Sequence, residues 1–486
     1  MPADSERSRY ERALQAYQQG DISTAIERLK LLIADFPEKD QYRIALANLY
    51  LGSQTPEAAC ELFSTKDPDN CYNQAYYAAK AGMVERAISL YEQSIDMGLQ
   101  HPAEAYNNIA ILQREEILDD DMAEATFKLA VELAPGYAAA IINLANLYED
   151  RGEKEQAKQL LLSIPQDDKQ YPTGLTRLAA MQRDGSMLTT LKDCLARTQS
   201  DPDQHCNMLY EIGHQLEASK QYEEAWQAFQ AANALNARFN RAFNPKWWRA
   251  RFEEAIQPVT NQAISTEHNL VFICGMFRSG STLLEQMLAA HPAIAAGGEL
   301  TLFPKLAQGL NPSKQQQAVS QYLQQISRVA NDKPWVTDKR PDNLWHIHKI
   351  KQLFPKAKIV ITERYLRDNA LSIYQQRLAP AMDYACNPQH IVEYAEYCQA
   401  LKEHWQKFYP EDVYIVHYEA LVKDPQATIT PILREMGLAW DDACLRFHTL
   451  NNTVKTASVW QVRQALHNQS IGRAKHYPAF LPERDA

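Results

Sequence analysis

Long apolar runs are absent from this 486-residue sequence, and no window approaches about 18 uncharged apolar residues, so we expect no membrane-spanning helix. Glycine is scarce, with 16 residues, which argues against an all-β chain. The eight cysteines are scattered without a C-x-x-C pair, so we expect reduced, mostly buried thiols and no metal or redox motif. The first six residues are polar and acidic, unlike a secretory signal, and the expected location is cytoplasmic.

An excess of basic residues is also lacking. The chain has 50 Lys and Arg against 60 Asp and Glu, a formal charge of -10, so no nucleic-acid partner is expected. The two halves differ, because residues 1–240 carry 22 basic and 37 acidic side chains whereas residues 241–486 carry 28 and 23. This asymmetry makes the second half the place to look for an anionic ligand.

The first half repeats a helical pattern with a period near 34 residues, which is typical of stacked helix-turn-helix units. Small residues recur where the two helices of a unit are expected to touch. These positions are Ala25, Ala58, Ala87, Ala123, Ala157 and Ala225. The gaps between them are 33, 29, 36, 34 and 68 residues, and the midpoint of the last gap is Leu191, in a degenerate unit.

This pattern resembles the tetratricopeptide repeat over about residues 6–238, with the second unit and the unit around Leu191 as the weakest matches. The resemblance implies an all-α superhelix, placed at residues 1–240, whose concave face binds an acceptor protein or peptide. A helical spacer without a ligand is the alternative. Residues 241–264 break the rhythm and are predicted to be a linker and the first helix of the next domain.

A phosphate-binding loop is predicted near the start of the second half. An apolar strand over 270–274 is followed by a loop over 275–282 and a helix from 283 to about 290. This order directs backbone N–H groups and the positive helix end toward an anion. Ser281 stands where nucleotide triphosphatases carry a lysine, and Arg278 supplies a cation earlier, which weakens a kinase interpretation. A βα turn that binds nothing is a further alternative.

The run Arg-Ser-Gly-Ser-Thr-Leu-Leu-Glu at 278–285, with Gly297-Gly298-Glu299 after it, resembles the 5′-phosphosulfate loop of sulfotransferases. The nearest likeness is to tyrosylprotein sulfotransferases and to bacterial proteins that fuse tetratricopeptide repeats to such a domain. The resemblance implies a P-loop-like α/β domain with a parallel sheet over 265–486, so the whole chain is predicted to be α followed by α/β. It also implies 3′-phosphoadenosine-5′-phosphosulfate as donor and no metal. The donor-binding residues implied in the loop are Arg278, Ser279, Gly280, Ser281 and Thr282.

Later segments resemble other family elements in the expected order. A strand over 357–362 leads to Arg364, and Ser372 follows on the next helix, as in the family's 3′-phosphate element; Tyr365-Leu366 departs from the usual Asp-Pro. Arginine's planar fork suits a phosphate dianion. The remaining matches are Lys339 near the leaving phosphate, Tyr418 near the adenosine, Ser458 at the leaving group, and Arg473 or Lys475 as a cap on phosphate charge.

Glu299 is the candidate general base, because a phenol with a pKa near 10 needs a proton acceptor during attack. A helix-capping role for Glu299 and a base role for His291 are the alternatives. The catalytic set implied is Glu299, Arg278, Lys339 and Ser458. The expected reaction is sulfuryl transfer to a hydroxyl, with a protein or peptide tyrosine first and a carbohydrate or small metabolite second. A catalytically dead repeat scaffold is the competing class, and the oligomeric state is not readable from the sequence.

Overall fold

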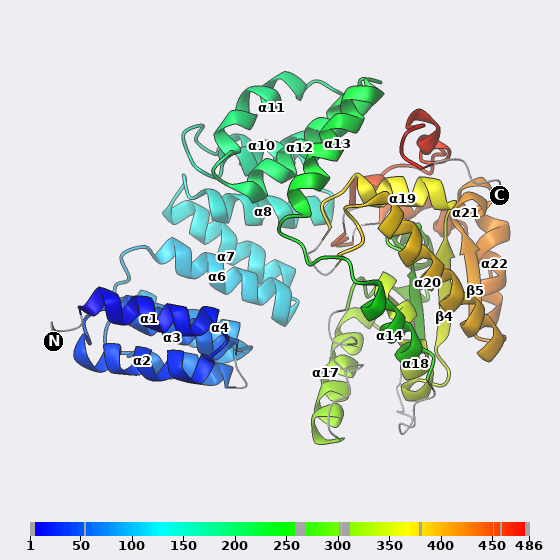
Figure 1. The fold of residues 1–486 in the computed structure, drawn as a ribbon. Coiled ribbons are helices and arrows are strands. Elements are labelled where there is room, and N and C mark those ends of the chain that lie inside the picture. Colours follow the sequence, from blue (N-terminus) through cyan, green and yellow to red (C-terminus); the bar gives the residue numbers. More distant parts are fainter. Residues whose placement is uncertain are drawn as a thin grey trace. The chain divides into compact units, whose positions relative to one another are not determined.

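The computed structural model describes residues 5–52, 55–257, 269–300, 303, 312–378, 382–450, 452–456 and 459–481 (Figure 1). They form two compact units, and each is described by itself. The first unit comprises residues 1–147 and 155–171, and the second comprises residues 148–154 and 172–486. No helix within the described ranges is long and apolar enough to cross a membrane.

The first unit consists of helices. Its α-helices are α1 (Glu6–Gln18), α2 (Ile22–Asp35), α3 (Asp40–Leu51), α4 (Pro68–Lys80), α5 (Val84–Asp96), α6 (Pro102–Leu112), α7 (Asp120–Leu133), α9 (Lys154–Leu162) and most of α8 (Ala138–Arg151). A 3₁₀ helix η1 (Pro56–Leu62) and a π-helix η2 (Gln113–Ile117) complete it. Helix α1 packs on α2, α4 on α5 and α6 on α7, which is the expected helix-turn-helix pairing.

The small residues predicted at helix contacts are buried almost without exception. Ala25, Ala87, Ala123 and Ala157 are fully buried. Ala58 is only half-buried, and its neighbour Ala59 is buried in its place. The reason is local, because this segment forms the 3₁₀ helix η1, which places side chains at a different angle from an α-helix. The second unit of the repeat pattern is therefore the irregular one, as its weak match predicted.

Four more α-helices open the second compact unit. They are α10 (Tyr171–Met181), α11 (Leu188–Leu195), α12 (Pro202–Ala218) and α13 (Tyr222–Asn236), with a 3₁₀ helix η3 (Ala196–Thr198) between α11 and α12. Helix α12 packs on α13, and the degenerate unit around Leu191 has a second helix of only 8 residues. Residues 172–236 thus fold in the same compact unit as the sheet. The domain boundaries proposed at residues 240 and 264 rest on the sequence pattern, and the second lies outside the described residues.

A five-stranded parallel sheet is the centre of the second unit. Its strands are β1 (Asn269–Gly275), β2 (Ile294–Ala295), β3 (Trp335–Lys339), β4 (Lys358–Glu363) and β5 (Val413–His417). They lie in the order β2-β3-β1-β4-β5, and every pair is parallel. The predicted fold class, a helical region followed by an α/β region with a parallel sheet, is confirmed.

Helices cover both faces of this sheet, and most residues of its strands are buried. The helices of this region are α14 (Pro245–Ala255), α15 (Ser281–Ala289), α17 (Pro312–Ala330), α18 (Ile347–Leu353), α19 (Leu366–Tyr374), α20 (Pro388–Phe408), α21 (Tyr418–Lys423), α22 (Pro425–Glu435) and α23 (Val459–Val462). Short 3₁₀ helices are η4 (Pro341–His346), η5 (Asp442–Thr449) and η6 (Arg473–His476). Alternate residues of β1 separate the faces: Val271 and Ile273 share a core cluster with residues of α15 and α22, whereas Phe272 contacts the aromatic rings of Phe303 and Phe354.

The strand order determines where a ligand can bind. After β1 the chain builds β2 and β3 on one side of it and then crosses to build β4 and β5 on the other. In open parallel sheets, ligands bind beyond the carboxyl ends of the strands at such a switch point. At this edge Lys339 ends β3, and Arg278, Arg364 and Tyr418 follow β1, β4 and β5; the sequence singled out all four.

Candidate functional site

The loop after β1 is shaped to receive an anion. Arg278 has a φ of 65°, which is uncommon for a residue with a side chain. Gly280 has a φ of 99° and stands at the N-cap of α15, where no side chain caps the helix. The first N–H groups of α15, on Ser281 and Thr282, therefore point to the loop without a capping oxygen, beside the positive end of the helix.

Gly280 is needed for close approach as well as for its backbone angle. A Cβ atom there would lie 2.6 Å from Cδ2 of Tyr418, which is closer than real Cβ contacts come. Tyr418 is buried, directly after β5. The phosphate loop and the predicted adenosine-site tyrosine are thus packed against each other.

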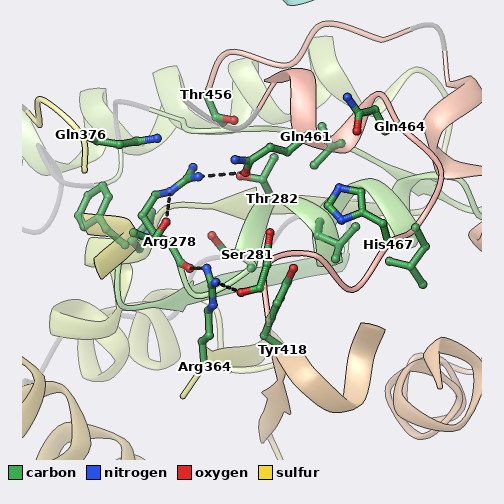
Figure 2. Close-up of a pocket in the computed structure, with 18 of the residues that line it drawn as sticks. Arg278, Ser281, Thr282, Arg364, Gln376, Tyr418, Thr456, Gln461, Gln464 and His467 are labelled. Atoms are coloured by element: carbon green, nitrogen blue, oxygen red, sulfur yellow. Dashed lines mark hydrogen bonds between the residues drawn. The ribbon is translucent and has the colours of Figure 1, made fainter. Parts of the chain in front are cut away.

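Arg278 reaches across the loop to two side chains from distant parts of the chain (Figure 2). Its Nε donates to Oγ of Ser372 at 3.1 Å, and its Nη2 donates to Oε1 of Gln461 at 2.9 Å. Burial, followed by the nearby charges of Arg364 and Arg473, lowers the pKa of Arg278 to about 9. The cationic form of this arginine is therefore disfavoured by its surroundings, and an anion placed there would relieve that cost.

Arg364 follows β4 and lies against the same loop. Its Nη1 donates to the carbonyl oxygen of Arg278 at 3.3 Å, and Nη2 donates to the carbonyl of Ser470. The guanidinium lies 4.8 Å from the ring centre of Tyr418. Its buried Nε has no hydrogen-bond partner among the described residues, and burial lowers the pKa of Arg364. A buried donor without a partner is a cost that a phosphate oxygen in this region would help to offset.

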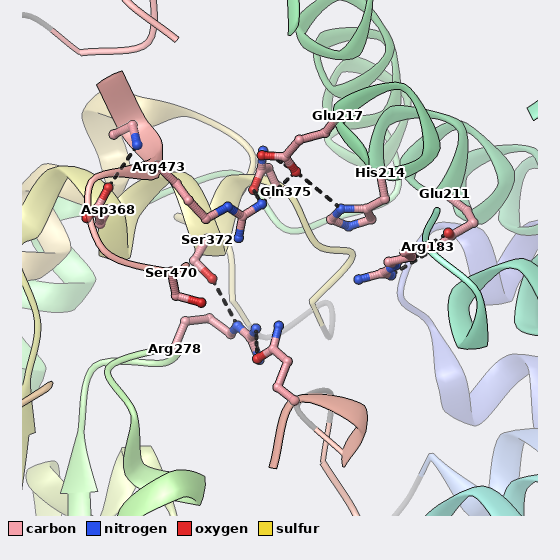
Figure 3. Close-up of polar contacts among 12 residues, drawn as sticks. Arg183, Glu211, His214, Glu217, Arg278, Asp368, Ser372, Gln375, Ser470 and Arg473 are labelled. Carbon is pink, nitrogen blue, oxygen red and sulfur yellow. Dashed lines mark hydrogen bonds and ion pairs between the residues drawn. The ribbon is translucent and has the colours of Figure 1, made fainter. Parts of the chain in front are cut away.

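Arg473 approaches from the C-terminal segment and is held by two side chains (Figure 3). Its Nη2 donates to Oε2 of Glu217 on α12 at 2.6 Å and to Oε1 of Gln375 at 2.9 Å. Asp368 fixes the turn around it, because its carboxylate accepts the N–H groups of Gly472 at 2.5 Å and Ala474 at 2.8 Å. Arg473 is thereby aimed at the cavity from outside the sheet.

Glu217 stays ionised across the neutral range. Its burial alone would raise its pKa, but the neighbouring His214 and Arg473 lower it to about 2. A carboxylate with a depressed pKa stabilises the fold above its ordinary pKa and loses that contribution only as the pH falls toward 2. The Glu217–Arg473 ion pair is thus present from pH 5 to pH 8.

Glu299 and Lys339 form an ion pair at the end of β3. Nζ of Lys339 lies 2.6 Å from Oε1 of Glu299, and the lysine side chain is 1% exposed against 35% for the glutamate. Glu299 lines the cavity, whereas Lys339 does not. Behind them, the buried Glu285 accepts from Oγ1 of Thr337 at 2.7 Å and from the N–H of Gly298 at 3.0 Å. This network fixes the Gly297-Gly298-Glu299 segment against β3.

These elements surround one cavity of 290 Å³, near the lower end of the range for ligand sites, about 300–1,000 Å³. Of the predicted residues, its lining includes Arg278, Gly280, Ser281, Thr282, Glu299, Arg364, Ser372, Tyr418 and Arg473. Three arginines, an uncapped helix end and a glycine that admits close approach suit a nucleotide with phosphates at two positions. The residues present therefore fit the donor that the sequence implied.

Other predicted residues are placed differently. The hydroxyl of Ser279 is bonded to the carbonyl of Met276 and to Oγ1 of Thr362, both at 2.6 Å, so it holds the loop and does not line the cavity. Lys475 is exposed and does not line the cavity, which leaves Arg473 as the cation of that pair at the site. Ser458 lies outside the described residues.

His291, the alternative base, is engaged elsewhere. Its Nδ1 accepts the N–H of Ala293 at 3.1 Å, and its Nε2 lies 3.1 Å from the carbonyl of Ala439. Both ring nitrogens are bonded to backbone groups, and His291 is buried away from the cavity. These contacts favour Glu299 as the proton acceptor.

Four residues that contact or position the site arginines were not among the predicted site residues. Gln461 contacts Arg278, while Glu217, Gln375 and Asp368 position Arg473. Glu217 and Arg473 are 256 residues apart, and no local pattern links them. Asp368 had a usable cue, because it lies in the first turn of the helix that carries Ser372. Within the described ranges, no group of three or more His, Cys, Asp or Glu side chains is arranged to hold a metal ion.

Comparison with known proteins assigns both regions to families. The sulfotransferase family model matches residues 270–318 and 310–442, and the tetratricopeptide repeat model matches residues 121–180. The chain thus has a sulfotransferase domain in its C-terminal region and a tetratricopeptide repeat in its N-terminal region, and the predicted family is confirmed.

Relatives of known sequence agree with this assignment at low identity. An uncharacterized protein of Aquifex aeolicus is 25% identical over 385 residues, which are 72% of this chain and 50% of that protein. A protein-tyrosine sulfotransferase of Drosophila melanogaster is 26% identical over 206 residues, 38% of this chain and 41% of the relative. The chain therefore spans about half the length of the relatives it matches. The sulfotransferase domain of a Synechococcus olefin synthase has 21% identity, covers 46% of this chain and 99% of that domain, and has a TM-score of 0.31.

The two cations at residues 473 and 475 provide a matched test of the site. We predict that Arg473→Ala lowers the affinity for 3′,5′-adenosine bisphosphate tenfold or more, because a charge-assisted contact is lost and Glu217 is left unpaired. Lys475→Ala, which removes an exposed charge two residues away, should change the affinity less than twofold. Calorimetric titration measures both. Equal losses in the two variants would show that Arg473 has no specific role.

A pH dependence follows from Asp338, the last residue but one of β3. Burial is the main cause that raises the pKa of Asp338 to about 7, although hydrogen bonds from Tyr322 and Asn343 oppose it. An acid whose pKa is raised by folding stabilises the fold below its ordinary pKa near 4, and this contribution is lost as the pH rises through 7. We predict that Asp338→Asn raises the unfolding temperature, relative to the unmodified protein, more at pH 8 than at pH 5. An equal rise in unfolding temperature at both pH values would contradict the raised pKa of Asp338.

Proposed function

We propose that the protein transfers a sulfuryl group from 3′-phosphoadenosine-5′-phosphosulfate to a hydroxyl group of an acceptor. The observation that carries the proposal is the convergence of Arg278, Arg364 and Arg473 on one cavity at the uncapped start of α15. Such an arrangement suits a ligand with more than one anionic group. The match to the sulfotransferase family supports the same reaction class.

In this proposal, two groups of residues bind different parts of the donor. Arg278 and the N–H groups of Ser281 and Thr282 hold the 5′-phosphosulfate, since they lie at the positive end of α15. Arg364 and Ser372 hold the 3′-phosphate. Arg278 and Ser372 are hydrogen-bonded to each other at 3.1 Å, so the two anion sites adjoin. The donor supplies the sulfuryl group when it is bound.

Glu299 acts as the general base in the proposed reaction. It accepts the proton of the acceptor hydroxyl while the new O–S bond forms and the S–O bond to the 5′-phosphate breaks. Once protonated, Glu299 no longer neutralises Lys339, whose charge becomes available at the moment when negative charge grows on the leaving phosphate. The 2.6 Å ion pair thus couples proton removal to charge stabilisation.

A tyrosine of a protein or peptide is the acceptor that we propose. Protein-tyrosine sulfotransferases of Drosophila melanogaster and Caenorhabditis elegans are similar to this chain at 26% and 25% identity. The tetratricopeptide repeat also supports a protein or peptide partner, because stacked repeats form extended binding surfaces. Carbohydrates and small metabolites remain the alternative acceptor class.

The base assignment predicts a clear separation of binding from turnover. Glu299→Gln should lower the turnover of a tyrosine peptide with ³⁵S-labelled donor by about 10²–10⁴-fold, which is the usual contribution of a general base, and should leave the affinity for 3′,5′-adenosine bisphosphate within about threefold. Arg278→Ala should lower both the turnover and the affinity for 3′,5′-adenosine bisphosphate. Glu435→Gln, at an exposed position of α22, is the matched control and should change neither. Near-normal turnover by Glu299→Gln would exclude Glu299 as the base.

A further inference from the structure

A second cavity adjoins the donor cavity within the second compact unit. It has a volume of 560 Å³, and its walls come from α10, α12, the segment after α19 and the C-terminal segment around α23. The two cavities share Gln376, Thr456, Gln461 and Gln464. Since Gln461 accepts a hydrogen bond from Arg278, a molecule in the second cavity would lie beside the side chain assigned to the sulfuryl group.

The charges on the walls of this cavity balance. Three arginines and three carboxylates line it. Nε of Arg177 pairs with Glu149 at 3.0 Å, and Arg183 pairs with Glu211 through both Nε and Nη2, the shortest distance being 2.9 Å (Figure 3). His214 also lines the cavity, and burial lowers its pKa, so it is neutral at physiological pH. The cavity has no net charge with which to select an acidic or a basic ligand.

The walls are nevertheless densely polar. Six carboxamide side chains line the cavity, and each has both a donor and an acceptor. Peptide groups present the same two functions alternately along an extended chain. Helix α10, which forms one wall, lies largely within the residues that match the tetratricopeptide repeat, 121–180. A repeat that binds an extended segment would therefore hold it next to the donor.

We infer that this cavity is the acceptor site, and that it takes an extended, uncharged peptide segment whose tyrosine enters the donor cavity past Gln461. The inference rests on the proposed function and adds the place and the chemistry of acceptor recognition. The last helical repeats are then part of the catalytic unit. Acidic residues beside the tyrosine are not required, because Arg177 and Arg183 already have carboxylate partners.

Filling the cavity tests this inference. Ala180 of α10 is half-buried and lines the cavity, so Ala180→Trp should obstruct it. Ala228 of α13 is also half-buried but lines neither cavity, so Ala228→Trp is the matched control. We expect Ala180→Trp to raise the KM of a 12-residue tyrosine peptide with neutral flanks at least tenfold, and Ala228→Trp to change it less than twofold. Both variants should retain the affinity for 3′,5′-adenosine bisphosphate.

A small acceptor separates failure of the site from failure of the function. N-acetyltyrosinamide needs only the donor cavity, and its turnover should be equal in Ala180→Trp and the unmodified protein. Equal KM values for the peptide in the two tryptophan variants would overturn the acceptor site while leaving the function intact. If the unmodified protein sulfates neither acceptor, the proposed tyrosine acceptor is wrong; a labelled peptide that still binds, with affinity reduced by Ala180→Trp, would then support the site alone.

The chemistry of the acceptor is tested with a peptide pair. Two peptides of equal length, one with Asp on both sides of the tyrosine and one with Ser, should have kcat/KM values within about threefold of each other. A preference of tenfold or more for the acidic peptide would overturn the neutral character of the site. Turnover of an oligosaccharide that Ala180→Trp reduces, with no turnover of either peptide, would assign the cavity to a carbohydrate instead.

Discussion

The second compact unit depends on one electrostatic constraint: arginine side chains are gathered, partly buried, where a parallel sheet and a helix N-terminus already concentrate positive potential. Arg278 donates to Ser372 and Gln461, and Arg364 donates to the carbonyl oxygens of Arg278 and Ser470; none of these four acceptors carries a charge. Burial is the main cause that lowers both pKa values; the charges of Arg364 and Arg473 add to it at Arg278, and the charge of Arg473 adds to it at Arg364, so a bound anion would offset part of this cost. Such an arrangement suits the binding of an anion. The topology makes it possible, since the switch point beside β1 brings the ends of four strands to the same edge.

The third arginine, Arg473, differs from the other two because it has a carboxylate partner, and this ion pair connects the C-terminal segment to α12. Arg473 is paired with Glu217, which belongs to a helix of the repeat type, while Asp368 fixes the turn that carries it. The last helices of the repeat pattern thus reach the donor cavity through an ion pair and line the adjoining cavity directly. These side chains connect the last helices of the repeat pattern to the donor cavity, beyond the covalent link in the sequence.

Much of this organisation could be predicted from the sequence, and the limits have physical reasons. The helix-contact alanines and the phosphate loop are local patterns, because helix packing selects small residues at a fixed period and an anion-binding turn needs glycine at fixed positions. The pairing of Glu299 with Lys339 could not be predicted, since it depends on how β2 and β3 lie side by side. The same holds for Glu217 and Gln461, whose partners are far away in the chain. The hydroxyl of Ser279 is a further example, because it is bonded to Oγ1 of Thr362 and holds the loop, a contact that the spacing of the motif does not indicate.

The central claim is that the gathered arginines recognise a nucleotide with phosphate at both the 3′ and the 5′ positions. The most direct measurement is the shift in unfolding temperature of the unmodified protein with 3′,5′-adenosine bisphosphate, with 5′-AMP, and with ATP plus Mg²⁺ at equal concentrations. We predict a large upward shift with the bisphosphate, a small one with 5′-AMP and none with ATP and Mg²⁺. Stabilisation by ATP and Mg²⁺ alone, or by none of the three nucleotides, would contradict it.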